Sequence, residues 1–298
     1  MIRVKVLEYL VAIAEHKHFG HAAKACFVSQ PTLSGQIMKL EEMLGLQLIE
    51  RHRHNIMLTP AGERLVKEAR NVIKATQAFE DTAKELLDPF SGDLHLGLIP
   101  TLAPYLLPVI MESLNENFPR INFYLHENKT QNLLADLNNG KLDLLILPWL
   151  EEMHSFEHYD LFAEPLILAT PKNHPLAQKK NVQLKDLNNQ QILTLEDGHC
   201  LRDQALGYCF SAGANEDNRF RATSLETLRH MVANGLGITL LPKLAALENN
   251  PAKNICYIPF KAPQPVRQIS LVIRPNYSRM ACVRGIVKTV RESIENMI

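Results

Sequence analysis

Apolar residues recur every three or four positions over the first 44 residues, and this period predicts three helices. The first spans residues 4–16, and the second lies in the alanine-rich stretch 20–27. The third begins after Ser29, a residue type that caps helices, and ends at Gly45. Two short helices joined by a tight turn, the second rich in short polar side chains, are typical of a helix-turn-helix.

The third helix and the segment after it carry the residues expected to contact DNA. Two short extended pieces flank residues 51–55 and predict a hairpin wing with basic side chains at its tip. Such a helix fits a major groove about 12 Å wide, and a wing can reach phosphates or the minor groove. The expected DNA-binding residues are Ser29, Gln30, Pro31, Thr32, Ser34, Gln36, Lys39, Arg51 and Arg53. The alternative is a structural three-helix module with a polar surface.

A long helix is predicted next, from about residue 60 to residue 87, because the apolar period continues without an internal proline. Its 28 residues would extend about 42 Å at 1.5 Å per residue. The DNA-binding domain of residues 1–60, called the head below, is too small to bury the apolar face of so long a helix. A partner helix is the natural cover, so this segment is interpreted as a dimerisation linker.

Strand and helix patterns alternate after a Pro-Gly-Ser-Asp break at residues 88–93, and this alternation predicts an α/β fold. The expected strands are 94–99, 121–126, 142–148, 166–171, 191–195, 219–222, 238–242, 255–259 and 268–274. The expected helices are 104–117, 130–139, 201–212, 224–234 and 278–297. A break near Glu164 and the late strand near 268–274 suggest two lobes that the chain crosses twice, with a ligand site in the cleft between them.

Three domains follow from these patterns. Residues 1–60 form the winged helix-turn-helix, 61–91 the linker and dimerisation helix, and 92–298 the regulatory domain. Lobe I of the regulatory domain covers about 92–163 and 269–298, and lobe II about 164–268.

Composition and charge exclude several other classes of protein. The 298 residues carry a formal net charge of zero, and residues 1–60 hold seven Lys or Arg against five Glu, an excess of only two. No apolar run reaches the roughly 18 residues of a membrane span, and no signal peptide is visible, so a cytoplasmic protein without a membrane partner is expected. The five cysteines are irregularly spaced, without a CxxC pair or a zinc pattern, so neither a disulfide framework, a metal nor a cofactor is expected.

Two cysteines in the stretch "LEDGHCLRDQALGYCF" carry the candidate chemistry. Cys200 is expected at a helix N-terminus beside His199 and Arg202, and each of these features favours the thiolate. Cys209 lies between two aromatic residues, Tyr208 and Phe210. If residues 201–210 are helical, the two cysteines are separated by roughly 13 Å along the axis, whereas a disulfide needs Cα atoms within about 7 Å. Such a pair can bond only if the helix unwinds, which suits a switch. The alternative is a pair of incidental cysteines.

The segment "FGHAAKACFVSQPTLSGQIMKLEEMLGLQLIERHRHNIMLTPAGE", followed by a long helix, resembles the LysR-type transcriptional regulators. The resemblance extends over the whole chain. It implies a winged head, homo-oligomers that include a dimer of dimers, and a two-lobed sensing domain built like a periplasmic binding protein.

The runs "LIPTLAPYLLP", "GHCLRDQA" and "FRATSLETLRHMVANGLGITLLP" resemble the OxyR subfamily, the hydrogen peroxide sensors among these regulators. This resemblance implies that Cys200 is peroxidatic and becomes a sulfenic acid, which Cys209 resolves as a disulfide. It also implies a peroxide pocket around Cys200. The implied pocket residues are Thr101, Thr130, His199, Asp203 and Arg267.

The function expected from this resemblance is a peroxide-responsive activator of antioxidant genes. Its implied partners are promoter DNA, hydrogen peroxide, RNA polymerase, and a thiol reductant such as glutaredoxin or thioredoxin. One alternative is a LysR-type regulator that senses a small metabolite in the cleft, with incidental cysteines. A second is a thiol peroxidase with a DNA head, ranked low because a sensor needs only one oxidation per signal; we therefore do not expect an enzyme.

Overall fold

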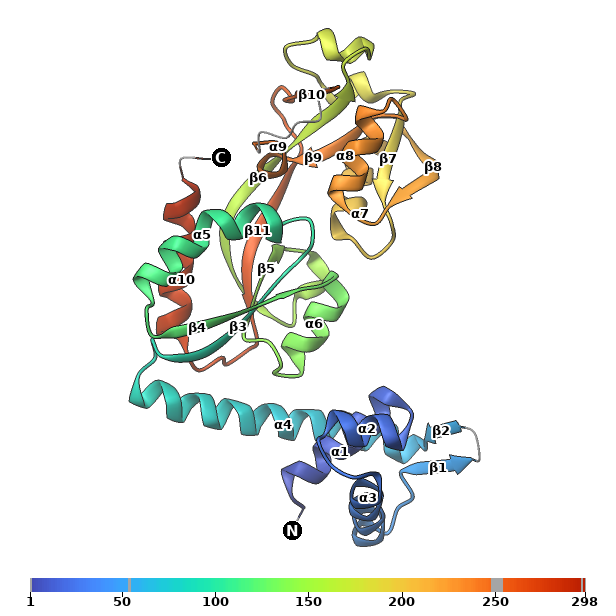
Figure 1. The fold of residues 1–298 in the computed structure, drawn as a ribbon, viewed down its shortest axis with the longest axis vertical. Coiled ribbons are helices and arrows are strands. Elements are labelled where there is room, and N and C mark those ends of the chain that lie inside the picture. Colours follow the sequence, from blue (N-terminus) through green and yellow to red (C-terminus); the bar gives the residue numbers. More distant parts are fainter. Residues whose placement is uncertain (1, 53–54, 248–253, 296, 298) are drawn as a thin grey trace. The chain divides into compact units, whose positions relative to one another are not determined.

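The computed structural model describes residues 2–52, 55–247, 254–295 and 297. The chain divides into two compact units, residues 1–87 and 88–298 (Figure 1). The first unit contains α1 (Val4–His16), α2 (Phe19–Ala25), α3 (Gln30–Leu44), β1 (Ile49–His52), β2 (Asn55–Leu58) and α4 (Pro60–Leu87). The three predicted helices and the long helix are therefore confirmed.

Local capping sets the ends of α3. The Ser29 hydroxyl accepts a hydrogen bond from the Thr32 amide, and Gly45 ends the helix in the left-handed conformation at φ 64°. The predicted cap and stop are therefore confirmed. Leu33, Ile37 and Leu40 of α3 are buried in the core that α1, α2 and α4 complete. An apolar stripe at this spacing holds the opposite, polar face of α3 outward.

The wing is an antiparallel hairpin in which β1 pairs with β2 from Ile49 opposite Leu58 to His52 opposite Asn55. Arg53, one of the expected DNA-binding residues, lies outside the described residues. The first turn of α4 begins directly after the hairpin, where the Thr59 hydroxyl accepts a hydrogen bond from the Gly62 amide.

The second unit is an α/β structure built on one large sheet and a smaller one. Its strands are β3 (Gly92–Leu98), β4 (Ile121–Glu127), β5 (Leu144–Pro148), β6 (Glu157–Pro171), β7 (Gln191–Leu195), β8 (Asn215–Ala222), β9 (Thr239–Pro242), β10 (Ile255–Ile258) and β11 (Val266–Ile273). Its helices are α5 (Ala103–Asn117), α6 (Thr130–Asn138), α7 (Cys200–Ser211), α8 (Leu225–Ala233), α9 (Lys243–Leu247) and α10 (Met280–Ile294). The large sheet has the order β10-β6-β11-β5-β3-β4, with β9 also paired to β6, and β7 pairs with β8 in the small sheet.

Two long strands, β6 and β11, run from one lobe of this unit to the other (Figure 1). The first half of β6 pairs with β11, and its second half pairs with β9 and β10. The sequence suggested a break near Glu164. The structure instead places Glu164 inside the continuous strand β6, directly opposite Arg267 of β11. The chain therefore crosses between the lobes within paired strands rather than in loops.

The sequence did not predict the first half of β6 or the short helix α9. Residues 157–164 read EHYDLFAE and bury only Leu161 and Glu164, so no apolar strand pattern was visible. Tertiary pairing with β11 makes this segment a strand.

The described residues contain neither a helix that could span a membrane nor a cluster of metal-binding side chains. No described helix combines the length and apolar character that crossing a bilayer requires. No three His, Cys, Asp or Glu side chains converge within the described part of the chain to hold a metal ion.

Candidate redox and DNA-binding sites

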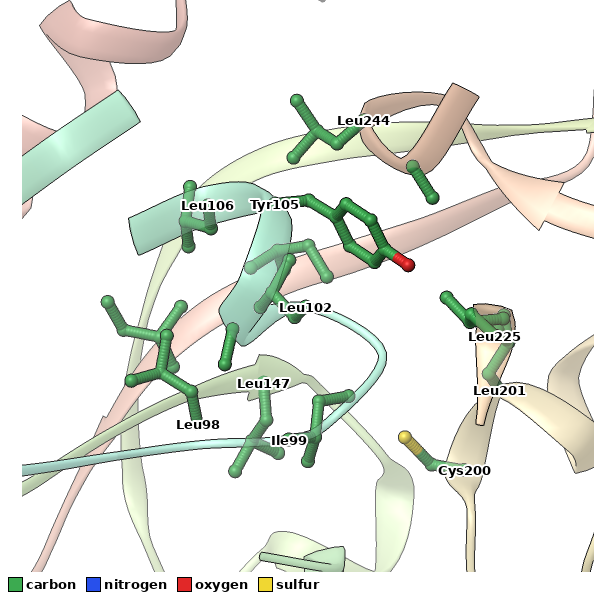
Figure 2. Packing of buried hydrophobic residues seen from close by; sticks show 14 of the residues in the cluster. Leu98, Ile99, Leu102, Tyr105, Leu106, Leu147, Cys200, Leu201, Leu225 and Leu244 are labelled. Atoms are coloured by element: carbon green, nitrogen blue, oxygen red, sulfur yellow. The ribbon is translucent and has the colours of Figure 1, made fainter. Parts of the chain in front are cut away.

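Cys200 is the first residue of α7, and its side chain is buried at the junction of the two lobes, with 7% of the residue exposed. Figure 2 shows its sulfur pointing away from α7 toward the segment that carries Ile99. The sulfur receives a hydrogen bond from the Leu201 amide, one of the amides that a helix N-terminus leaves free. The helix start thus contributes directly to the surroundings of the thiol.

Three polar residues from the strand and helix ends are linked to Cys200: Thr130 and Arg267 act on the thiol directly, and Thr101 is bound to Arg267. Thr101 follows β3, Thr130 is the first residue of α6, and Arg267 lies near the start of β11. All three are buried, with 1–6% exposed. Within the described residues, the buried Thr130 hydroxyl has no geometrically defined hydrogen-bond partner, yet it influences the Cys200 thiol and lowers the pKa of that thiol. The structure therefore brings three of the predicted pocket residues together with Cys200.

Arg267 is held rigidly. Its Nε donates to Glu164 Oε2 at 2.7 Å, Nη1 donates to Thr101 Oγ1 at 3.2 Å, and Nη2 donates to the Thr101 carbonyl oxygen at 3.1 Å. Glu164 also accepts a hydrogen bond from the Leu244 amide. Neither charged side chain is exposed. Removing one partner of a buried pair typically costs about 3–5 kcal/mol, so this pair fixes the cation near the sulfur.

Burial raises the pKa of the Cys200 thiol above its ordinary value. The Thr130 hydroxyl, the positive charge of Arg267 and the Leu201 amide lower the pKa, but together they do not offset burial. The resting thiol is therefore mostly protonated. Groups that stabilise the thiolate surround it, so they act when the proton leaves.

The expectation that Arg202 and His199 favour the thiolate is wrong. The Arg202 guanidinium instead binds Glu216 at 2.9 Å, and it also contacts Asp197 and Asp203. Burial and the nearby Lys129 lower the pKa of His199, so its ring is neutral at pH 7 and brings no positive charge.

Asp203 does not join the enclosed group. Its side chain is 74% exposed and binds Arg202 at 3.2 Å, and its charge raises the pKa of Cys200. His199 is buried beside Cys200 as the N-cap residue of α7, with Nε2 3.9 Å from Glu196 Oε1. The roles of His199 and Asp203 toward peroxide stay predictions.

Cys209 lies near the other end of α7 and is fully buried. Burial alone raises the pKa of its thiol to about 12. Both cysteines are free thiols. Because one helix contains both, nine positions apart, the two cysteines are separated by about 13 Å along the helix axis. The predicted helix between the two thiols is confirmed, and it keeps the sulfurs out of bonding reach.

Two residues of this site were missed from the sequence. Glu164 holds Arg267, and Lys129 Nζ donates to Glu196 Oε1 at 2.5 Å and to the Asp197 carbonyl oxygen at 3.2 Å. Lys129 thereby links the start of α6 to the loop that leads into Cys200. No local pattern signals either contact, because each joins residues more than 60 positions apart.

The expected DNA-binding face of α3 is accessible to different degrees. Gln30, Pro31, Thr32 and Lys39 are exposed, and Ser34 and Gln36 are half-buried. Ser29 is exposed, but its hydroxyl already binds the Thr32 hydroxyl at 2.7 Å. Arg51 lies in β1, with its backbone paired opposite Ile56.

Another cap in the head was not predicted. The His18 side chain accepts hydrogen bonds from the Gly20 and His21 amides and so begins α2. A histidine N-cap is uncommon, which is why the sequence pattern gave no signal.

Comparison with known proteins decides the family. Residues 4–63 match the family model of the bacterial regulatory helix-turn-helix protein, lysR family, and residues 88–295 match the LysR substrate binding domain. The chain belongs to the LysR family. The predicted fold class, a winged helix-turn-helix with a long helix followed by a two-lobed α/β sensing domain, is confirmed.

Within the LysR family, several similar proteins are named hydrogen peroxide-inducible genes activators. The activator of Dickeya chrysanthemi is 49% identical over 294 residues, which cover 99% of this chain and 96% of that protein. The DNA-binding transcriptional dual regulator OxyR of Escherichia coli K12 is 48% identical, with the same coverage. The predicted resemblance to the OxyR subfamily is thus confirmed.

Solved structures agree with this placement. A full-length OxyR variant from Pseudomonas aeruginosa is 34% identical with a TM-score of 0.75, and the match covers 98% of both chains. A structure of the reduced form of OxyR is 45% identical with a TM-score of 0.64; it covers 70% of this chain and 98% of that one.

Proposed function

We propose that this LysR-family chain is a DNA-binding transcription activator that senses hydrogen peroxide through a reversible Cys200–Cys209 disulfide and controls antioxidant genes. The observation that carries the proposal is the placement of Cys200. A buried thiol at a helix N-terminus is influenced by Thr130 and Arg267, Arg267 is itself bound to Thr101, and the same helix holds Cys209 near its other end. The names of the similar proteins support the same function.

Oxidation begins when Cys200 loses its proton and the sulfur attacks one oxygen of hydrogen peroxide. The S–O bond forms as the O–O bond breaks, which gives a sulfenic acid, and the leaving oxygen takes the proton to become water. Arg267, fixed by Glu164, stabilises the negative charge on the sulfur and on the departing oxygen. Thr130 and Thr101 supply hydroxyls that can hold the peroxide.

Resolution joins the two sulfurs. The Cys209 sulfur attacks Cys200, the S–S bond forms, and the sulfenic oxygen leaves as a second water. Two thiols and one hydrogen peroxide therefore give one disulfide and two waters. Bonding needs Cα atoms within about 7 Å, which an intact α7 does not allow. Oxidation must then be accompanied by unwinding of α7, and this movement is the signal.

The signal passes to DNA through the oligomer. The regulatory unit of residues 92–298 rearranges, the helix within residues 61–91 joins copies into a dimer of dimers, and the heads of residues 1–60 change their promoter contacts. The activated form recruits RNA polymerase. A thiol reductant such as glutaredoxin or thioredoxin restores the two thiols, which resets the switch. The helix-turn-helix family match supports promoter DNA as the partner.

The test compares the wild type with Cys200→Ser, Cys209→Ser and the control Cys256→Ser, a half-buried cysteine on β10. Each full-length protein receives one equivalent of peroxide, after which disulfides are mapped by mass and promoter DNA is footprinted. We expect a Cys200–Cys209 disulfide and a changed footprint in the wild type and in Cys256→Ser. Cys200→Ser should bind DNA without responding, and Cys209→Ser should stop at the sulfenic acid.

A normal footprint change in Cys200→Ser would refute the proposal. A metabolite sensor would keep its response to a small ligand after both cysteines are replaced by serine. A thiol peroxidase would instead show sustained peroxide turnover with a thiol reductant. The named relatives are transcription regulators, which supports the ranking of the enzyme below the sensor.

A further inference from the structure

Phe27 lies in the turn between α2 and α3 and has two unfavourable features. Its side chain is 96% exposed, so a large aromatic ring is left in water. Its backbone has φ 55°, in the left-handed region that favours glycine and asparagine. The ring is thus not covered by other residues of the first unit.

The backbone conformation at Phe27 is imposed by its neighbours. The Phe27 amide donates to the Lys24 carbonyl at 3.1 Å, and the Val28 amide donates to the Ala23 carbonyl at 3.0 Å. These two bonds end α2. Val28 then packs against the core of the head, and Ser29 caps α3. The turn is therefore well anchored, and any residue at position 27 would project outward.

Residue type is what distinguishes position 27. Of the four non-glycine residues with positive φ in the described part of the chain, two are asparagines, the third is Lys17, and the fourth is Phe27. Asparagine would adopt the left-handed backbone of the turn with less strain, and a polar side chain at this position would be hydrated by solvent. The presence of an aromatic ring here points to a partner that covers it.

Phe27 precedes the cap of α3 by two residues, so it lies close to the start of that helix, where Gln30 and Thr32 are exposed. In a helix-turn-helix, the N-terminal residues of the second helix are those that approach base edges. The apolar surfaces that DNA offers to a phenyl ring there are the thymine methyl group and the deoxyribose face. We propose that Phe27 contacts this apolar surface of DNA beside the N-terminus of α3. This inference rests on the DNA-binding function proposed above.

The experiment first lets the reduced, full-length wild type select sites from its own genomic DNA. Affinities of the variants for these sites are then measured over a range of salt concentrations. Phe27→Asn should bind about tenfold more weakly, the size of one lost base contact. The slope of affinity against salt should not change, because no phosphate contact is lost. Phe27→Leu, which keeps an apolar side chain, should stay within about threefold of the wild type.

A stability measurement separates this loss from damage to the head. Phe27→Asn should slow amide hydrogen exchange in α2 and α3 of the full-length protein, because asparagine tolerates the left-handed backbone. Lys17→Asn is the matched control, since Lys17 has φ 47° at the end of α1 in the same head. Lys17→Asn should also slow amide hydrogen exchange in the head. Because this variant removes a positive charge, any change in its affinity for DNA should alter the slope of affinity against salt concentration.

Replacing each thymine of a selected site by uracil then identifies the surface contacted. If one uracil weakens the wild type but not Phe27→Asn, the ring contacts that methyl group. If no uracil has an effect, the contact is with deoxyribose. Wild-type affinity in Phe27→Asn, or an equal loss in Phe27→Leu, would overturn the inference. Failure of the wild type to select any DNA would instead refute the proposed function.

Discussion

At the scale of single residues, Cys200 is governed by two opposing influences. Burial disfavours its charged form, while Arg267, Thr130 and the Leu201 amide favour it. The balance leaves a protected thiol whose thiolate is stabilised once formed. This arrangement suits a sensor, because a permanently ionised thiol would react with many oxidants.

Replacing Thr130 by Val tests this balance. The methyl group keeps the shape of Thr130, but the hydroxyl that lowers the pKa of Cys200 is lost. A higher pKa means less thiolate, so oxidation by peroxide at pH 7 should slow by about fivefold, the value of one ordinary hydrogen bond. Stopped-flow rates between pH 6 and pH 9 provide the measurement.

The ratio of the two rates should stay constant from pH 6 to pH 9, because the raised pKa of Cys200 keeps both thiols below saturation and the thiolate fraction rises in parallel in both proteins. A ratio that approached one within this range would mean that the thiols titrate there, which would contradict the raised pKa of Cys200. Identical rates across the whole pH range would show that Thr130 does not influence the thiol.

His199 gives a prediction about stability and pH. Burial lowers its pKa in the folded protein below the ordinary value of 6.5, so the unfolded chain takes up the proton first as the pH falls. The contribution of neutral His199 to the free energy of unfolding is therefore complete above pH 6.5. It is lost as the pH falls from 6.5 through the lower pKa that His199 has in the folded protein. His199→Gln should reduce the fall in the free energy of unfolding between pH 7 and pH 5, as measured by urea titration. An unchanged pH dependence would contradict this role.

The sequence correctly predicted a helix between the two thiols, but it did not predict which groups act on Cys200. His199 and Arg202 adjoin Cys200 in the chain, yet neither brings it positive charge. Arg267 does so from a distant strand. Adjacent side chains along a helix N-terminus point in different directions, so chain proximity alone does not show which group faces a sulfur.

At the scale of elements, α7 is both the scaffold of the two thiols and the barrier between them. Its stability sets how readily the disulfide forms. Gly207 lies within this helix, and a Cβ built there meets no atom within 4 Å. Alanine can therefore replace it without strain.

Gly207→Ala should stabilise α7 by roughly 0.5–1 kcal/mol. Only the reduced form keeps the intact helix, so the reduction potential of the Cys200–Cys209 couple should rise by roughly 10–20 mV, since 30 mV corresponds to about 1.4 kcal/mol. Redox titration in glutathione buffers measures the shift.

Gly35→Ala is the control, because Gly35 lies inside α3 of the head and has equally open surroundings. It should leave the potential unchanged. A potential of Gly207→Ala equal to that of the wild type would mean that α7 stays helical in the oxidised form.

At the scale of the whole molecule, α4 carries the feature that points to assembly. Val72 and Phe79 are 44% and 76% exposed, and they lie seven residues apart on one face of the helix. A repeat of apolar residues at this spacing is typical of a helix that packs against a partner helix. The proposed role of residues 61–91 in dimerisation depends on this face.

Changing Val72 and Phe79 together to Glu should weaken the dimer, because two charges would replace buried apolar surface. Burying one large apolar side chain contributes about 1.5–3 kcal/mol, so the dissociation constant should rise by at least about tenfold. Sedimentation equilibrium of the full chain measures the constant. Lys67→Glu, on another side of α4, should have little effect, and an unchanged constant in the double variant would exclude this face from the interface.

The sequence by itself determined the local features of this protein. The helices of the head, the cap at Ser29, the stop at Gly45 and the helix between Cys200 and Cys209 all follow from patterns that span a few residues. Helical period and capping are short-range effects, so the chain states them directly.

Only the tertiary structure decided what surrounds Cys200. The pairing of β6 with β11 sets Glu164 opposite Arg267, and the lobes then bring Thr101 to Arg267 and Thr130 to the sulfur from separate parts of the chain. Strand pairing and burial depend on contacts between residues far apart in sequence, which no local pattern encodes. For the same reason, the raised pKa of Cys200 reflects the fold rather than the residues beside it in the chain.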